Sequence, residues 1–177
     1  MGKIVVGFPC IGKSSLKEIG WIDLRSDCFW IGEEDKKIRP AGWYESYCNV
    51  AIDLANQGYN VLVPSHEAVR RYLKSRGVDY MVVYPDPSLK DQWIQKCYDR
   101  YKENPNRETL SAYEAVRDHW DYFMKDLSSE ESAIVIKDMD YSLKRTIWDT
   151  DYVYIKVPVG TDFGAPLGEE LGSSGII

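Results

Sequence analysis

The sequence predicts one α/β domain, built on a five-stranded, mainly parallel sheet with helices on both of its faces. Three observations predict this class. The chain has 177 residues, which is enough for one domain of this kind. The segments between the apolar runs show apolar residues at helical spacing. Short runs of β-type residues recur between them, at 3–6, 21–24, 59–63, 80–84 and 133–137.

The first run leads directly into a glycine-rich loop. Residues 7–14 read Gly-Phe-Pro-Cys-Ile-Gly-Lys-Ser, which has the form G-x-x-x-x-G-K-[ST] of a phosphate-binding P-loop. The two glycines allow the backbone to curl, so that several N–H groups point at phosphate oxygens. Lys13 is expected to reach the β- and γ-phosphates, and the Ser14 hydroxyl to coordinate Mg²⁺. The sequence therefore predicts a site for ATP.

The whole loop and the residue after it are predicted to hold this nucleotide: Gly7, Phe8, Pro9, Cys10, Ile11, Gly12, Lys13, Ser14 and Ser15. The simpler interpretation is a glycine-rich turn between a strand and a helix, without a ligand. Such a turn has no need of Lys and Ser together, which favours the nucleotide site.

A short helix from Ser14 to Ile19 and the strand at 21–24 come next. Ligands of α/β sheets gather at the carboxyl ends of the strands, where Asp23 and Asp27 are placed. A carboxylate at this position can help to hold Mg²⁺ or accept a proton from an attacking hydroxyl. We assign Asp23 to catalysis and to the metal and Asp27 to the substrate. The alternative is that one of them only caps a turn.

Residues 30–42 are polar and are interpreted as a loop or lid. Arg39, at its end, is a candidate contact for a substrate phosphate, and the alternative is a solvated surface arginine. A helix is predicted over 43–57, followed by the third strand.

The third and fourth strands also end in polar residues. After the third strand, Ser65, His66 and Arg70 are candidate substrate contacts, although for His66 we favour the alternative, a residue that only starts a helix. After the fourth strand, a helix is expected over 88–101.

Arg100 and Arg107 flank a break at 102–107, where a short helical lid, over about 100–108, is expected. We assign Arg100 to catalysis and Arg107 to substrate binding. A long helix over 109–127 leads to the fifth strand. The predicted division is a nucleotide-kinase-like domain at 1–150 and a tail at 151–177.

The tail is expected to hold an edge strand at 152–157, with an irregular stretch from 160 to 177.

Composition narrows the function. The net charge of −6 and the pI near 5.0 argue against a nucleic-acid binder, which normally presents a basic face. No apolar stretch approaches the roughly 20 residues of a membrane span, and no signal peptide is evident at the start. The four cysteines include no C-x-x-C pair, which favours a reduced, cytoplasmic setting. Cys10 is interpreted as a small filler of the loop or, alternatively, as a redox-sensitive thiol.

The loop and the later motifs together resemble the small P-loop nucleotide kinases related to adenylate kinase, in particular the type found in phages and prophages. Besides residues 7–14, the resemblance is carried by Ile22–Ser26, Pro64–Arg70 and Val83–Asp91, with weaker support around residues 98–100 and 120–121. It spans residues 3 to about 127. It implies a three-layer P-loop NTPase fold with a short helical lid.

The resemblance implies transfer of the γ-phosphoryl group of Mg-ATP to a nucleotide-like acceptor, with a nucleoside monophosphate as the first choice. By the same resemblance, Lys13 neutralises charge in the transition state and Arg70 clamps the acceptor phosphate. Arg100 and Arg107 would be the arginines of the lid. The sequence departs from the family where Val63-Pro64-Ser65-His66 replaces D-G-[FY]-P-R, and its lid is short. The base of the acceptor and the oligomeric state are left open.

Two other interpretations remain open. One is a kinase for a nucleoside or another small hydroxyl acceptor, with Asp23 as the base. The other is a module that binds ATP without turning it over. A GTPase is not supported, since no N-K-x-D or D-x-x-G motif occurs.

Overall fold

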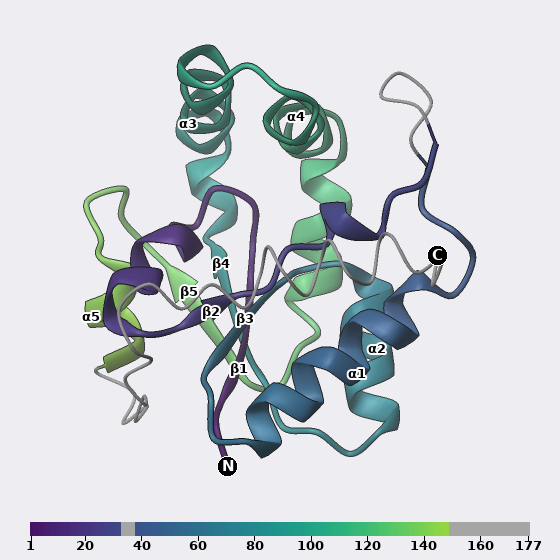
Figure 1. The fold of residues 1–177 in the computed structure, drawn as a ribbon. Coiled ribbons are helices and arrows are strands. Elements are labelled where there is room, and N and C mark those ends of the chain that lie inside the picture. The colour runs from purple at the N-terminus through teal and green to yellow at the C-terminus, as the bar shows by residue number, and fades with distance from the viewer. Residues whose placement is uncertain (33–37, 149–177) are drawn as a thin grey trace.

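The computed structural model describes residues 1–32 and 38–148, which form an α/β domain (Figure 1). Its five strands are all parallel and lie in the order β2-β3-β1-β4-β5. They are β1 (Ile4–Gly7), β2 (Ile22–Asp23), β3 (Val61–Pro64), β4 (Met81–Pro85) and β5 (Ala133–Ile136). The predicted class and the five strands are confirmed, and the sheet is parallel throughout.

The helices surround this sheet on both sides, as Figure 1 shows. The α-helices are α1 (Trp43–Asn56), α2 (Glu67–Ser75), α3 (Lys90–Glu103), α4 (Arg107–Leu127) and α5 (Leu143–Trp148). The 3₁₀ helices are η1 (Lys13–Ile19), η2 (Asp27–Phe29) and η4 (Pro87–Leu89). η1 packs against α5 on one side of the sheet, and α1 packs against α2 on the other. α3 and α4 lie side by side beyond the carboxyl ends of the strands.

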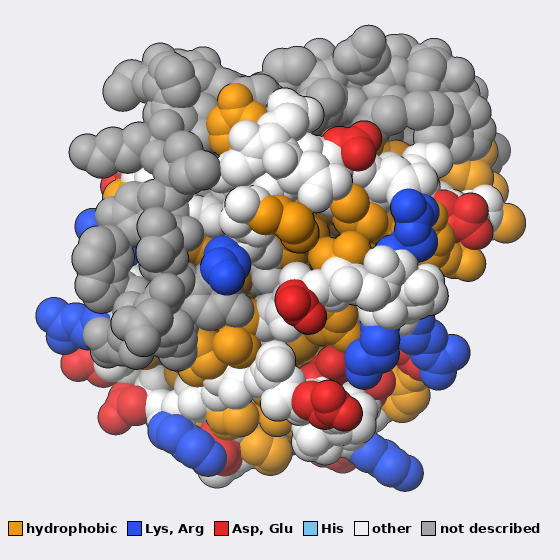
Figure 2. Space-filling view, turned by 90° about the horizontal axis from the view of Figure 1, so that it is seen from below, with side chains coloured by type: hydrophobic (Ala, Val, Ile, Leu, Met, Phe, Trp, Pro, Cys, Tyr) orange, Lys and Arg blue, Asp and Glu red, His pale blue; other side chains and the backbone are white. Residues whose placement is uncertain are grey.

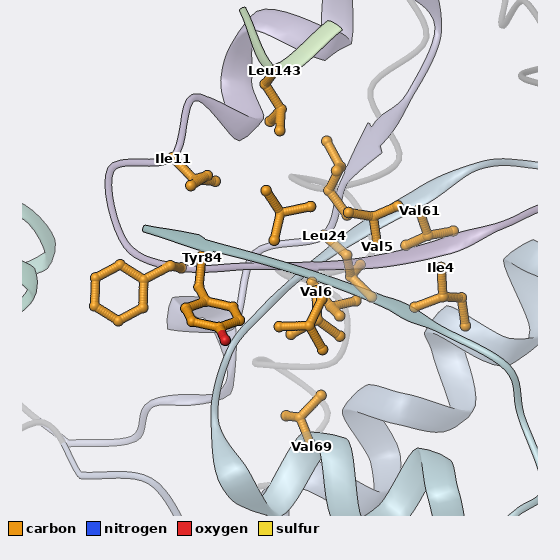
Figure 3. Close-up of a cluster of buried hydrophobic side chains, with 14 of the residues drawn as sticks. Ile4, Val5, Val6, Ile11, Leu24, Val61, Val69, Tyr84 and Leu143 are labelled. Carbon is orange, nitrogen blue, oxygen red and sulfur yellow. The ribbon is translucent and has the colours of Figure 1, made fainter. Parts of the chain in front are cut away.

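The core lies on both faces of the central strands. All four residues of β1 are buried, because other strands flank it on both edges and helices cover both faces. Figure 3 shows Ile11 and Leu143 on one side of the sheet and Val69 of α2 on the other. A strand that is buried on both faces has a continuous run of apolar residues, so it is easy to recognise from the sequence.

The segment between α3 and α4 is shorter than the predicted break. Asn106 caps α4: its side chain accepts a hydrogen bond from the Thr109 backbone N–H at 2.9 Å, and its own N–H donates to Thr109 Oγ1 at 3.2 Å. This capping box lets α4 begin at Arg107, two residues earlier than predicted. Only residues 104–106 separate the two helices.

The sequence analysis did not anticipate α5, a helix of six residues that packs on η1. Its periodicity is too short to be recognised without the contact. The predicted edge strand at 152–157, the stretch from 160 to 177 and the boundary at 150 lie outside the described residues.

No helix in the described part of the chain has the length and apolar character needed to span a membrane. Figure 2 views the molecule from below, and on that face Lys and Arg side chains are interspersed with Asp and Glu.

Candidate functional site

The loop after β1 is tightly curled, and glycine is favoured at positions 7 and 12 for different reasons. A Cβ on Gly7 would lie 2.9 Å from Ile11 Cγ2 and 3.0 Å from the Lys13 side chain, so the curl leaves no room for one. Gly12 has a φ of 99°, in the left-handed region that favours glycine. Cys10 also has a positive φ, of 64°, and is the one non-glycine residue with a positive φ among those described.

Some of the loop's backbone N–H groups are used inside the fold. The amides of Phe8, Ile11 and Ser15 donate to the carbonyl oxygens of Val83 (3.0 Å), Phe8 (3.2 Å) and Gly12 (3.1 Å). Four others donate to no described residue: those of Cys10, Gly12, Lys13 and Ser14. Unpaired N–H groups carried by one curled segment form the kind of nest that binds anions.

The Lys13 ammonium lies within this curl. Its Nζ donates to the carbonyl oxygens of Gly7 at 3.0 Å and Phe8 at 3.4 Å. Burial lowers the pKa of Lys13, and the charge of Asp23 opposes that shift. A partly desolvated cation held beside free amides favours a polyanionic ligand.

The loop opens into a cavity of about 520 Å³, a volume within the usual range for small-molecule sites. Most of the residues assigned to the site from the sequence line it: Gly7, Pro9, Cys10, Ile11, Gly12, Lys13, Ser14, Asp23, Asp27, Arg39, Ser65 and Arg100. Phe8 and Ser15 are not among the lining residues. The Phe8 ring is buried edge-on against Trp93, Trp120 and Phe123, so this residue contributes only backbone to the loop.

Asp23 ends β2 beside the loop. Burial raises its pKa, and the positive charge of Lys13 partly offsets this. A hydroxyl at Ser14 and a carboxylate at Asp23 line the same cavity, and both are oxygen donors of the type that Mg²⁺ prefers. Asp27, farther along the wall, pairs with Arg25, whose Nε lies 3.0 Å from Oδ1.

Arg100, on α3, reaches over the loop from the other side. It donates from Nη1 to Cys10 Sγ at 3.8 Å, and its Nη2 lies 3.8 Å from Glu108 Oε1. Its side chain remains 45 % exposed, so it is free to change partners.

Arg39 lies between two aromatic rings in the wall opposite the loop. Its guanidinium carbon is 4.5 Å from the Trp43 ring centre and 5.2 Å from that of Trp30. Nη2 donates to Ser26 Oγ at 3.1 Å, whereas Nε is buried without a partner among the described residues. This environment differs from that of a solvated surface arginine, which was the alternative interpretation.

Two other predicted arginines do not line the cavity, although each contacts residues of its wall. Arg70 is only 3 % exposed, because its guanidinium is ion-paired with Asp126 and Glu130. Its Nε also donates to the Ser65 carbonyl at 3.2 Å. Arg107 lies over the Trp30 ring at 5.0 Å. Neither is among the described lining residues.

The sequence analysis missed the side of the cavity formed by α4. This wall combines acidic, small and aromatic residues: Glu108, Ser111, Ala112, Ala115, Tyr122, Phe123 and Asp126. The first four recur at helical spacing, which is the signal that would have identified them. His66 also lines the cavity, and burial lowers its pKa to about 3, so that it is neutral at physiological pH.

No protein-family model and no curated protein matches the sequence.

Proposed function

We propose that this protein is an ATP-dependent phosphotransferase, which moves the γ-phosphoryl group of Mg-ATP to a nucleoside monophosphate. The observation that carries the proposal is the curled loop, which holds the Lys13 ammonium and in which four amides donate to no described residue. That loop opens into one cavity, whose lining includes the Asp23 carboxylate and the arginines Arg39 and Arg100. Phosphoryl transfer depends on positioning and electrostatics more than on covalent chemistry, and these are the groups it requires.

The free amides and Lys13 provide the donors for the phosphates of ATP. A Cβ at position 7 would collide with the Lys13 side chain, so Gly7 keeps that side chain in place. On binding, Lys13 exchanges its two carbonyl partners for phosphate oxygens. The negative charge of the phosphates then stabilises the ammonium group, which burial disfavours in the free protein.

Ser14 and Asp23 are the residues that would hold Mg²⁺. When bound, the metal neutralises charge on the phosphates as it builds up during transfer. Asp23 is held close enough to Lys13 for their charges to affect each other's pKa, and this interaction helps to keep the buried carboxylate ionised.

Two arginines serve the transferred group and the acceptor. Arg100 has exposed N–H groups and weak partners, so it can turn toward the phosphates. Arg39 offers a buried Nε that has no partner among the described residues, and its guanidinium is held between Trp30 and Trp43, which suits the planar recognition of a phosphate. Arg70 was the first choice for this clamp from the sequence, but its guanidinium is occupied by two carboxylates.

The all-parallel sheet with a strand, loop and helix at its start supports the finer assignment to the three-layer P-loop NTPase fold, with the α3–α4 turn as a short lid. A small nucleotide substrate, no nucleic acid and a cytoplasmic location complete the proposal. The acidic net charge of −6 supports the absence of nucleic-acid binding.

The test is a coupled assay of ADP release with Mg-ATP and each ribo- and deoxynucleoside monophosphate. The proposal predicts that one or a few monophosphates stimulate ADP release strongly. ATP binding without stimulation by any acceptor would identify a binding module and contradict the proposal.

A second function has one observation in its favour. The pKa of Asp23 is raised by burial, and a carboxylate with a raised pKa is better suited to accept the proton of an attacking hydroxyl. This property favours a nucleoside or another small alcohol as acceptor. A panel of nucleosides in the same assay separates the two kinases.

A further inference from the structure

The two thiols of Cys10 and Cys97 have no part in the proposed reaction, although one of them belongs to the loop. Both cysteines are free. Cys10 is partly exposed in the cavity, whereas Cys97 on α3 is 1 % exposed. Each thiol shifts the pKa of the other, so the two are neighbours across 87 residues of sequence.

The contacts of α3 explain how the pair is brought together. One turn before Cys97, Trp93 donates its indole N–H to the Pro9 carbonyl at 2.9 Å. One turn after it, Arg100 donates to Cys10 Sγ at 3.8 Å. Residues at these spacings share one helix face, so Cys97 is held against the loop from both directions.

We propose that Cys10 and Cys97 form a redox-active dithiol, which a hydroperoxide converts to an intramolecular disulfide between the loop and α3. The structure places the partly exposed Cys10 beside the Arg100 guanidinium, and the buried Cys97 on the face of α3 that packs against the loop. Accessible thiols next to positive charge are the ones that oxidants select.

The electrostatics assign the attacking sulfur. The pKa of Cys10 is lowered to about 6, because it accepts a hydrogen bond from Cys97 and lies beside the charges of Arg100 and Lys13. The pKa of Cys97 is raised by its bond to Cys10 and by burial. The pair thus keeps one proton, on Cys97, with the thiolate at Cys10, which lies in the cavity.

The reaction has two balanced steps. The Cys10 thiolate attacks one peroxide oxygen, so an S–O bond forms and the O–O bond breaks. The sulfur is oxidised by two electrons, and the leaving hydroxide takes a proton from solvent to form water. Cys97 sulfur then attacks the sulfenic sulfur of Cys10, so that an S–S bond forms and the S–O bond breaks. The released hydroxide takes the Cys97 proton, and one peroxide has yielded two waters.

The test treats the full-length protein with hydrogen peroxide at neutral pH, without nucleotide, and maps the peptides under non-reducing conditions. The wild type should lose about 2 Da and give a peptide pair that joins Cys10 to Cys97, both reversed by dithiothreitol. In Cys97→Ser, Cys10 should instead accumulate as a sulfenic acid that dimedone traps. In Cys10→Ser, the buried Cys97 should stay reduced.

Cys48→Ser is the matched control. Cys48 is also buried and free, but its thiol donates to the Val69 carbonyl at 3.7 Å, and burial raises its pKa to about 12. This variant should form the Cys10–Cys97 link at the wild-type rate. Dimedone adducts at Cys10 of the wild type without a cross-link, or oxidation of Cys48 as fast as that of Cys10, would overturn the proposal.

One extension rests on the proposed function. Bound Mg-ATP covers the loop and should slow the oxidation of Cys10 by about tenfold or more at concentrations well above its Kd, since only the free fraction reacts. If the disulfide forms and Mg-ATP gives no protection, the dithiol stands and the nucleotide site is contradicted. If no disulfide forms, the dithiol is wrong, and nucleotide binding is unaffected by that result.

Discussion

The two walls of the cavity are built in different ways. The loop wall is a single run of residues, 7–14, whose curl is fixed by its own glycines and by bonds to neighbouring backbone. The opposite wall brings together side chains from the β2–α1 segment, the start of α2 and the face of α4. Within this wall, Arg39 is held between the rings of Trp30 and Trp43. The loop wall is therefore local and preformed, whereas the opposite wall depends on the assembled fold.

Lys13→Ala, in the loop wall, should have the largest effect on activity. We expect kcat to fall on the order of 10²–10³-fold, because a positioned charge in the transition state is lost. The melting temperature should change little, since Nζ bonds only two loop carbonyls and is held there partly desolvated. Steady-state ADP release and thermal unfolding measure the two quantities.

Lys17→Ala, exposed on the same 3₁₀ helix, is the control and should keep its activity. Equal losses of activity in both lysine variants would show that the loop ammonium has no special role.

Arg70→Ala tests the assembled wall. This substitution leaves the carboxylates of Asp126 and Glu130 without their buried partner, and the free energy of unfolding should fall by about 3 kcal/mol. The acceptor KM of the folded enzyme should change by less than about threefold, a difference smaller than 1 kcal/mol. Denaturant unfolding and acceptor kinetics give the two values.

Arg71→Ala is the matched control, because Arg71 is 79 % exposed and pairs with Glu67 one turn away. Its unfolding free energy should stay within about 0.5 kcal/mol of the wild type. A stable Arg70→Ala variant with a greatly raised acceptor KM would instead support the prediction from the sequence, that Arg70 clamps the acceptor phosphate.

Arg39→Ala should affect the acceptor and spare ATP. Losing a buried, charged donor raises the acceptor KM by about tenfold, while the KM for ATP stays within about twofold. Arg107 does not line the cavity, so Arg107→Ala, which removes the second cation at Trp30, should have a smaller effect on both constants. If both KM values rose together in Arg39→Ala, the two walls would not be separate sites.

His66→Asn gives the smallest effect at neutral pH, where the histidine is uncharged, and its effect is seen in the pH dependence of stability. The folded pKa of His66, about 3, is below the ordinary value of 6.5, so the unfolded chain binds this proton first as pH falls. Stability is therefore complete above pH 6.5 and declines toward pH 3, by at most about 1.4 kcal/mol per pH unit.

The variant should show a flatter loss of stability over this window, measured by denaturant unfolding at successive pH values. A slope unchanged from the wild type would mean that His66 is solvated in the folded state.

The same difference between local and assembled structure explains how far the sequence could be interpreted. The buried strands β1, β3 and β4 were evident as apolar runs, and the loop from its spacing, because each depends on neighbouring residues alone. Arg39 and Arg70 could not be distinguished, since which arginine meets carboxylates depends on Asp126 and Glu130, more than fifty residues from Arg70. The roles of Trp30 and of the α4 face also arise only from tertiary contact.

The measurement that tests the central claim most directly is calorimetry of the purified protein with Mg-ATP. A preformed loop with a desolvated lysine, and with four amides that have no partner in residues 1–32 and 38–148, should bind one triphosphate per chain and release measurable heat. Lys13→Ala should weaken that binding. No heat with any nucleoside triphosphate in the presence of magnesium would contradict the account.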